Sequence, residues 1–118
     1  MTIYALSSGS GISGIAVIRV SGINTSKVIK KLTGSQLPTP RVATLKKFNK
    51  NGRKEMIDEG VIIWFPAPNS YTGEDLAEFH VHGSRAVIKA MHSTISKVQN
   101  CTKCKKAFIF KRWIWSPG

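Results

Sequence analysis

The pair Asn51-Gly52 narrows the possible folds of this 118-residue chain more than any other feature, because it lies between two strand-like runs. Both central positions of a two-residue hairpin turn require positive φ angles, which asparagine and glycine adopt at low cost. Residues 41–48 precede the pair and residues 55–65 follow it. We therefore expect an antiparallel hairpin, in which the apolar stretch Val61–Phe65 is the most buried strand of the sheet.

The spacing of apolar side chains predicts the other elements. β-branched residues favour a strand over 15–20, and alternation of apolar and polar residues favours another over 75–81. A short apolar run covers 3–6. Apolar residues recur at helical spacing over 27–32 and again from Ser84 onward. The order strand, strand, helix, hairpin, strand, helix is typical of a single α+β domain. We expect a mixed β-sheet with the helices packed on one side.

The net charge of +12 is unevenly distributed, since all six acidic residues lie within positions 55–78. The excess of lysine and arginine favours polyanionic partners, although a solvated lysine-rich surface accounts for it equally well. No apolar run is long enough to span a bilayer, and residues 1–4 do not begin a secretory signal. We therefore expect a cytoplasmic protein with no membrane partner.

The segment Gly9–Gly14 matches the dinucleotide-binding pattern G-x-G-x-x-G. That pattern binds a pyrophosphate only where its glycines open a helix, and here they precede a strand-like run. The acidic residue that should follow about 20 positions later is missing, because no Asp or Glu precedes Glu55. The chain also has no Walker A sequence. We interpret the segment as a flexible turn between two strands.

Glu78, His80 and His82 alternate with apolar residues and should share one face of their strand. Imidazole and carboxylate are suitable zinc or iron ligands, but three such groups on one element are too few, and a solvent-facing polar row is the preferred interpretation. The carboxylate of Glu78 also suits a heterocycle with adjacent N–H and NH2 donors, such as a pterin. Arg19 lies in an apolar run, where it could pair with Glu78 or bind a ligand acid.

Three ordered blocks of the sequence resemble the tRNA-modifying GTPase family MnmE, also called TrmE. Gly14–Gly22 resembles the strand near the start of these proteins, with its single arginine. Ile57–Gly60 followed by Phe65–Asp75 resembles the family's most distinctive block, and Glu78–Gly83 resembles the E-x-x-x-H-G that comes next. The resemblance covers residues 1–98 or so.

The resemblance implies a domain similar to the folate-binding domain of aminomethyltransferases. Family members bind 5-formyl- or methylene-tetrahydrofolate there, form homodimers, and modify the wobble uridine of certain tRNAs together with the FAD protein MnmG. Arg19 and Glu78 correspond to the family's two folate contacts in this domain, with Glu78 expected at the pterin edge. We expect no catalytic residue and no metal ligand in this chain. The resemblance implies that GTP, Mg²⁺ and K⁺ belong to other domains of the family.

The chain departs from the family beyond residue 100. We expect a folate-binding and dimerisation domain over 1–100 and an unrelated basic tail over 101–118, disordered or produced by a frameshift. Cys101 and Cys104 are too few to imply a disulfide framework or a zinc site. The family's helical domain, with a further folate-contacting lysine, and its GTPase domain are not recognisable, so we expect no GTP hydrolysis or complete tRNA modification by this chain alone. The alternatives are a small basic nucleic-acid-binding protein, with Trp113 and Trp115 as stacking residues, and a non-functional gene remnant.

Overall fold

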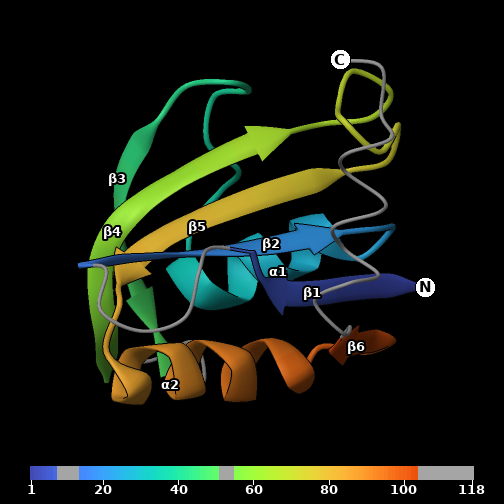
Figure 1. Ribbon diagram of the computed structural model, residues 1–118. Helices are drawn as coiled ribbons and strands as arrows, with labels where there is room; N and C mark the ends of the chain where they lie inside the picture. Colours follow the sequence, from blue (N-terminus) through green and yellow to red (C-terminus); the bar gives the residue numbers. More distant parts are fainter. Residues whose placement is uncertain (8–13, 51–54, 104–118) are drawn as a thin grey trace.

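The computed structural model describes residues 1–7, 14–50 and 55–103 of the chain. Within these ranges a six-stranded sheet carries two helices, as Figure 1 shows. The elements in chain order are β1 (Thr2–Leu6), β2 (Ile15–Ser21), α1 (Thr25–Thr33), β3 (Thr44–Asn49), β4 (Met56–Phe65), β5 (Leu76–His82), α2 (Arg85–Ser96) and β6 (Cys101–Lys103).

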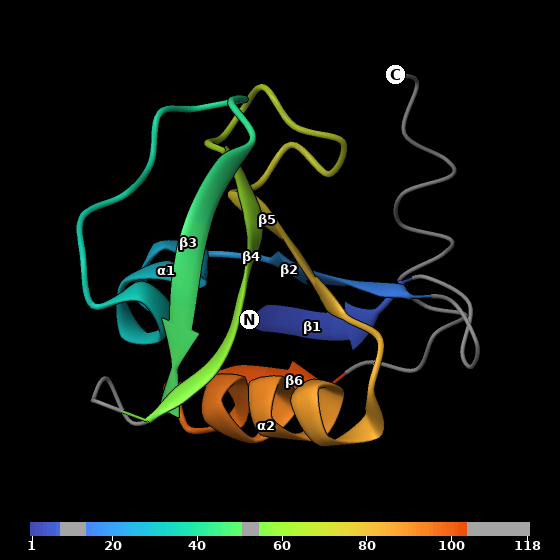
Figure 2. The ribbon, with the colours of Figure 1, turned by 90° about the vertical axis from the view of Figure 1, so that its left-hand side faces the viewer.

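The sheet has the strand order β3-β4-β5-β2-β1-β6. Every neighbouring pair is antiparallel except β1 and β6, which run parallel, so the sheet is mixed. Strand β5 lies between the pair β3–β4 and the pair β2–β1, as Figure 1 shows. Figure 2 shows that β3 and β4 run steeply across the direction of β1 and β2. The predicted α+β class and mixed sheet are confirmed.

Both helices pack on the same face of the sheet. Residues from α1, α2 and alternate positions of the strands form one apolar core. In β2 and β5 the core positions are occupied by Ile18 and Phe79, which are fully buried. Their sequence neighbours point to the other face, because side chains alternate along a strand. The expectation of helices on one side is therefore confirmed. Among the described residues, neither helix has the length and apolar character needed to cross a bilayer.

Residues at the helix ends explain where α1 stops and where α2 begins. Helix α1 ends at Gly34, which adopts the left-handed conformation with φ of 65° and donates its N–H to the Lys30 carbonyl. The side chain of Ser84 accepts a hydrogen bond from the N–H of Val87 and so caps α2. Asn24 precedes α1 without capping it by its side chain, which instead donates to the Gln99 carbonyl at 2.7 Å.

The burial of β4 differs from expectation. Strand β4 is not the most buried strand: Ile62 and Trp64 are buried, whereas Val61, Ile63 and Phe65 between and beside them are partly exposed. The helices cover only one face, so a continuous apolar run still alternates between core and surface. The antiparallel pairing of β3 with β4 fits the predicted hairpin, whose turn at positions 51–52 lies outside the described residues, as does most of the glycine segment 9–14.

Strand β6 was not predicted. It pairs with β1 so that Thr2 is opposite Cys101, and the Thr2 N–H donates to the Asn100 carbonyl at 3.1 Å. The sheet thus continues three residues past the predicted boundary at position 100. The character of residues 104–118 falls outside the described ranges and stays a prediction.

Candidate functional site

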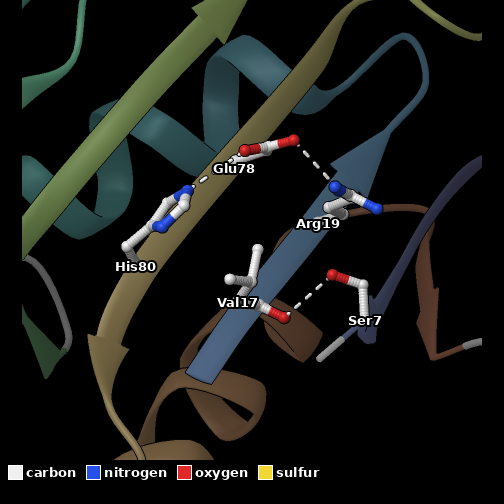
Figure 3. Close-up of polar contacts among 5 residues, drawn as sticks. All are labelled: Ser7, Val17, Arg19, Glu78 and His80. Carbon is white, nitrogen blue, oxygen red and sulfur yellow. Dashed lines mark hydrogen bonds and ion pairs between the residues drawn. The ribbon is translucent and has the colours of Figure 1, made fainter. Parts of the chain in front are cut away.

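Arg19 and Glu78 lie directly opposite each other in the register of β2 and β5. The Nε of Arg19 donates to Oε2 of Glu78 at 3.0 Å, as Figure 3 shows. Both side chains are on the face of the sheet that the helices leave uncovered, since their neighbours Ile18 and Phe79 fill the core. The sequence left two roles open for Arg19, and the structure shows the ion pair with Glu78.

His80 completes the arrangement around the carboxylate. Its Nε2 lies 3.0 Å from Oε1 of Glu78, so each carboxylate oxygen has one partner (Figure 3). The Glu78 side chain is 12% exposed, against 30% for Arg19. Each oxygen of an ionised carboxylate has two lone pairs, so each can accept more than one hydrogen bond. Alternation along the strand placed His80 on this face, but nothing in the sequence alone showed its contact with Glu78.

His82 does not join this group. Its Nδ1 lies 2.8 Å from Oδ1 of Asp58 in β4, and its backbone N–H donates to Oδ2 at 2.8 Å. Burial by itself would raise the pKa of Asp58, but the hydrogen bonds from His82 and the charge of its ring outweigh it and hold that pKa below its usual value. The polar row of β5 is thus divided between two acids. Within the described part of the chain, no three metal-ligating side chains are grouped to hold a metal ion.

The distinctive segment between β4 and β5 folds back toward the same face. The hydroxyl of Ser21, two residues beyond Arg19 on β2, lies 2.9 Å from the Thr72 hydroxyl and donates to Glu74 at 3.4 Å. Within the segment, the Ala67 N–H donates to Asp75 at 2.8 Å. These bonds hold the segment close to the Arg19–Glu78 pair, so motif blocks far apart in the sequence meet in space.

Apolar residues lie beside the ion pair. Ile3, Ala5 and Leu76 form a small buried cluster with Phe65 packed against it. Ala5 is opposite Arg19 in the β1–β2 register, which puts the cluster next to the pair. On the other side, the partly exposed Ile63 is opposite Glu78. The arrangement combines a fixed anionic acceptor with apolar surface, which suits a flat heterocycle that has donors along one edge.

The edge of β2 near this site is fixed by β1. The N–H and the hydroxyl of Ser7, the residue after β1, both donate to the Val17 carbonyl, at 2.8 and 3.1 Å. Figure 3 shows the bond from the hydroxyl. Val17 is also opposite His80 in the β2–β5 register. The backbone under the three polar side chains is therefore held by bonds on both sides, and a rigid support of this kind keeps the side chains in position.

Comparison with known proteins gives a consistent set of relatives. A family model described as GTP-binding protein TrmE N-terminus matches residues 2–108. The chain is similar to the tRNA modification GTPase MnmE of Pelagibacter ubique, with 67% identity over 101 residues, covering 86% of this chain and 23% of that protein. It is also similar to the mitochondrial 5-taurinomethyluridine-[tRNA] synthase subunit GTPB3 of Danio rerio, with 51% identity over 90 residues, 76% of this chain and 18% of that protein.

A third relative aligns over almost the whole length. The MnmE of Brucella anthropi is 45% identical over 118 residues, covering 99% of this chain and 26% of that protein. The chain thus spans about a quarter or less of the curated relatives it matches. Since the family model covers most of the sequence, including all the motif blocks near Arg19 and Glu78, the chain belongs to the family of TrmE (MnmE) N-terminal domains.

Proposed function

We propose that this domain binds a reduced folate, 5-formyl- or methylene-tetrahydrofolate, with Glu78 and Arg19 as contacts, and that it serves as a homodimerisation module in the modification of tRNA wobble uridines. The observation that carries the folate proposal is the Glu78 carboxylate, which Arg19 and His80 hold from two sides at 3.0 Å. We further propose tRNA and an MnmG-like FAD protein as partners. Cytoplasmic location is a proposal too, since the Danio rerio relative is named as a mitochondrial protein.

The chemistry of Glu78 supports a pterin ligand. A pterin presents an N–H and an NH2 side by side, and a carboxylate can accept from both at once. Arg19 and His80 fix the plane of the carboxylate before a ligand arrives, which lowers the entropy cost of forming the two bonds. Because the Glu78 side chain is only 12% exposed, a ligand would displace little water from it. The partly exposed apolar side chains of Ile63 and Phe65 lie beside the carboxylate and would contact the rings.

The test is titration calorimetry of the full chain with 5-formyl-tetrahydrofolate. Replacing Glu78 by Gln keeps the shape but turns one acceptor into a donor that opposes the ligand's own donors. We expect affinity to fall by at least about tenfold, because hydrogen bonds to a charged group contribute roughly 1.5–3 kcal/mol. The matched control is Glu55→Gln, which removes the same charge from an exposed side chain that faces Lys50 at 3.7 Å.

Equal loss of binding in Glu78→Gln and Glu55→Gln would disprove the proposed contact. A second variant, Arg19→Lys, keeps the positive charge but removes the Nε donor. We expect it to weaken folate binding less than Glu78→Gln, because Arg19 orients the acceptor that meets the pterin edge. Tighter binding in Arg19→Lys than in the unmodified chain would contradict this role.

The proposed homodimer is supported by the face of the sheet that the helices leave uncovered. Ile15 in β2 and Leu45 in β3 are 59% and 64% exposed. By strand alternation both point to the same side as Arg19. Apolar side chains on a sheet face are suited to burial against a second copy.

Sedimentation velocity should show a dimer that Leu45→Lys converts to a monomer. An exposed helix change, Lys27→Gln, is the control and should leave the dimer intact. A chain that is monomeric at every concentration tested would refute the dimer without affecting the folate test.

A further inference from the structure

A second candidate site lies on the opposite side of the sheet from Arg19 and Glu78. A cavity of about 960 Å³ opens between α2, β1 and β6. Its apolar wall comes from Tyr4, Leu6 and Ile88. Tyr4 and Leu6 belong to the helix-side core, so the cavity is separate from the candidate folate site. The volume is that of pockets that hold small organic molecules.

Positive charge surrounds this cavity. Arg85 and Lys89 are one helical turn apart on α2, and Lys103 contributes from β6. None of the described residues lining the cavity is acidic. Nor does any of these three cations form an ion pair with a carboxylate in the described ranges. Three like charges around one cavity repel one another, and an anion bound among them would remove that repulsion.

His92 supplies an unsatisfied polar atom in the same cavity. Its Nε2 is buried and has no hydrogen-bond partner among the described residues. The ring lies edge-on to Tyr4, with centroids 5.4 Å apart and planes at 62°. Burial, and then the positive charge of Lys103, lower the pKa of His92 to about 4, so the ring is neutral at neutral pH. A buried ring nitrogen without a partner is uncommon in a folded protein and suggests a ligand or bound water.

We propose that the cavity binds a phosphate monoester of about nucleotide size, with the phosphate among Arg85, Lys89 and Lys103 and the organic part against Tyr4, Leu6 and Ile88. A phosphate dianion has oxygens pointing in several directions, which matches cations on two different elements better than a flat carboxylate does. The hydroxyls of Ser93 and Ser96 at the cavity can donate further bonds, and Nε2 of His92 gains a partner.

Calorimetry with three probes tests the proposal: uridine 5′-monophosphate, inorganic phosphate and uridine. We expect uridine 5′-monophosphate to bind at least about tenfold more tightly than uridine, because the nucleoside lacks the charged group. Lys89→Gln and Arg85→Gln should each weaken binding by about tenfold or more. Lys27→Gln, an equal charge change on α1, should have little effect. Equal weakening by Lys27→Gln, equal binding of uridine, or no binding of either phosphate compound would overturn the proposal.

Nuclear magnetic resonance provides a second readout on the unmodified chain. On addition of uridine 5′-monophosphate, the backbone amide of His92 should shift, whereas that of Glu78 on the other face should not. Shifts confined to residues outside the cavity would overturn the assignment. In Glu78→Gln the monophosphate should bind with unchanged affinity, so failure of the folate proposal and failure of this one are distinguishable.

Discussion

Acidification from pH 7 to pH 5 should destabilise this domain through His92. The ring has a pKa of about 4 in the folded protein, because of burial and then the charge of Lys103, against 6.5 for an ordinary histidine. Between these values the unfolded chain binds a proton that the folded chain does not. The contribution of His92 to stability is therefore complete above about pH 6.5 and is lost progressively as the pH falls toward 4.

The size of the effect follows from the two pKa values. A pH of 5 is 1.5 units below the pKa of the unfolded imidazole, which is therefore protonated, while the folded ring is still mostly neutral. At about 1.4 kcal/mol per unit, this corresponds to about 2 kcal/mol lost from the free energy of unfolding. Because the ring is only partly buried, solvent reduces the figure, and we expect about 1–2 kcal/mol. This is a large share of the stability of a small domain.

Urea denaturation followed by circular dichroism at pH 7 and pH 5 measures the effect. The comparison variant is His92→Phe, which keeps an aromatic ring against Tyr4 but cannot bind a proton. Between pH 7 and pH 5 the free energy of unfolding should fall in both proteins. The fall in the variant should be smaller than that in the unmodified chain by at least about 1 kcal/mol. Asp58 does not interfere: with its pKa held below 3.8, its contribution is present above that value and is lost only in more acidic solution. Identical losses in the two proteins would refute the assignment to His92.

Three further changes test the packing. Gly60→Ala would place a Cβ 2.1 Å from the backbone oxygen of His80, and we expect a loss of about 2–3 kcal/mol in unfolding free energy by urea denaturation; an unchanged midpoint would contradict that close approach. Ile62→Ala empties a fully buried core position and should lower the same free energy by about 2–5 kcal/mol, whereas a loss below about 1 kcal/mol would show that the site collapses freely. Ser84→Ala removes the cap on the Val87 N–H and should cost about 1 kcal/mol, with faster amide exchange in the first turn of α2; unchanged exchange would argue against the cap.

Local patterns were sufficient for most of the fold. The strand β2 and the helix α2 were predictable because the spacing of their apolar residues depends only on which face meets the core. Burial of β4 was wrongly predicted, since a run of five apolar residues from Val61 gives no sign of whether one face or both are covered. Strand β6 is three residues long and owes its extended form to pairing with β1, about a hundred residues away in sequence, which no local pattern reveals.

In the candidate site, too, local patterns predicted which face a side chain lies on but not which residues it contacts. Alternation placed Glu78, His80 and His82 on one face, and the structure confirms that they share it. Which of them meet a partner depends on the register between strands, and that is a long-range property. Arg19 is opposite Glu78 only because β2 and β5 pair in one particular register. The contact between His82 and Asp58 likewise required the position of β4.

The central place of β5 links ligand binding to the cohesion of the whole sheet. The β1–β2 pair and the β3–β4 pair can each form from residues nearby in sequence, but they become one sheet only when β5 inserts between them. Arg19 and Glu78 straddle one of the two junctions that this insertion creates. A molecule that contacts both side chains would have to leave before the two halves could separate. Its binding energy would therefore raise the unfolding temperature of the entire domain and not of a local segment.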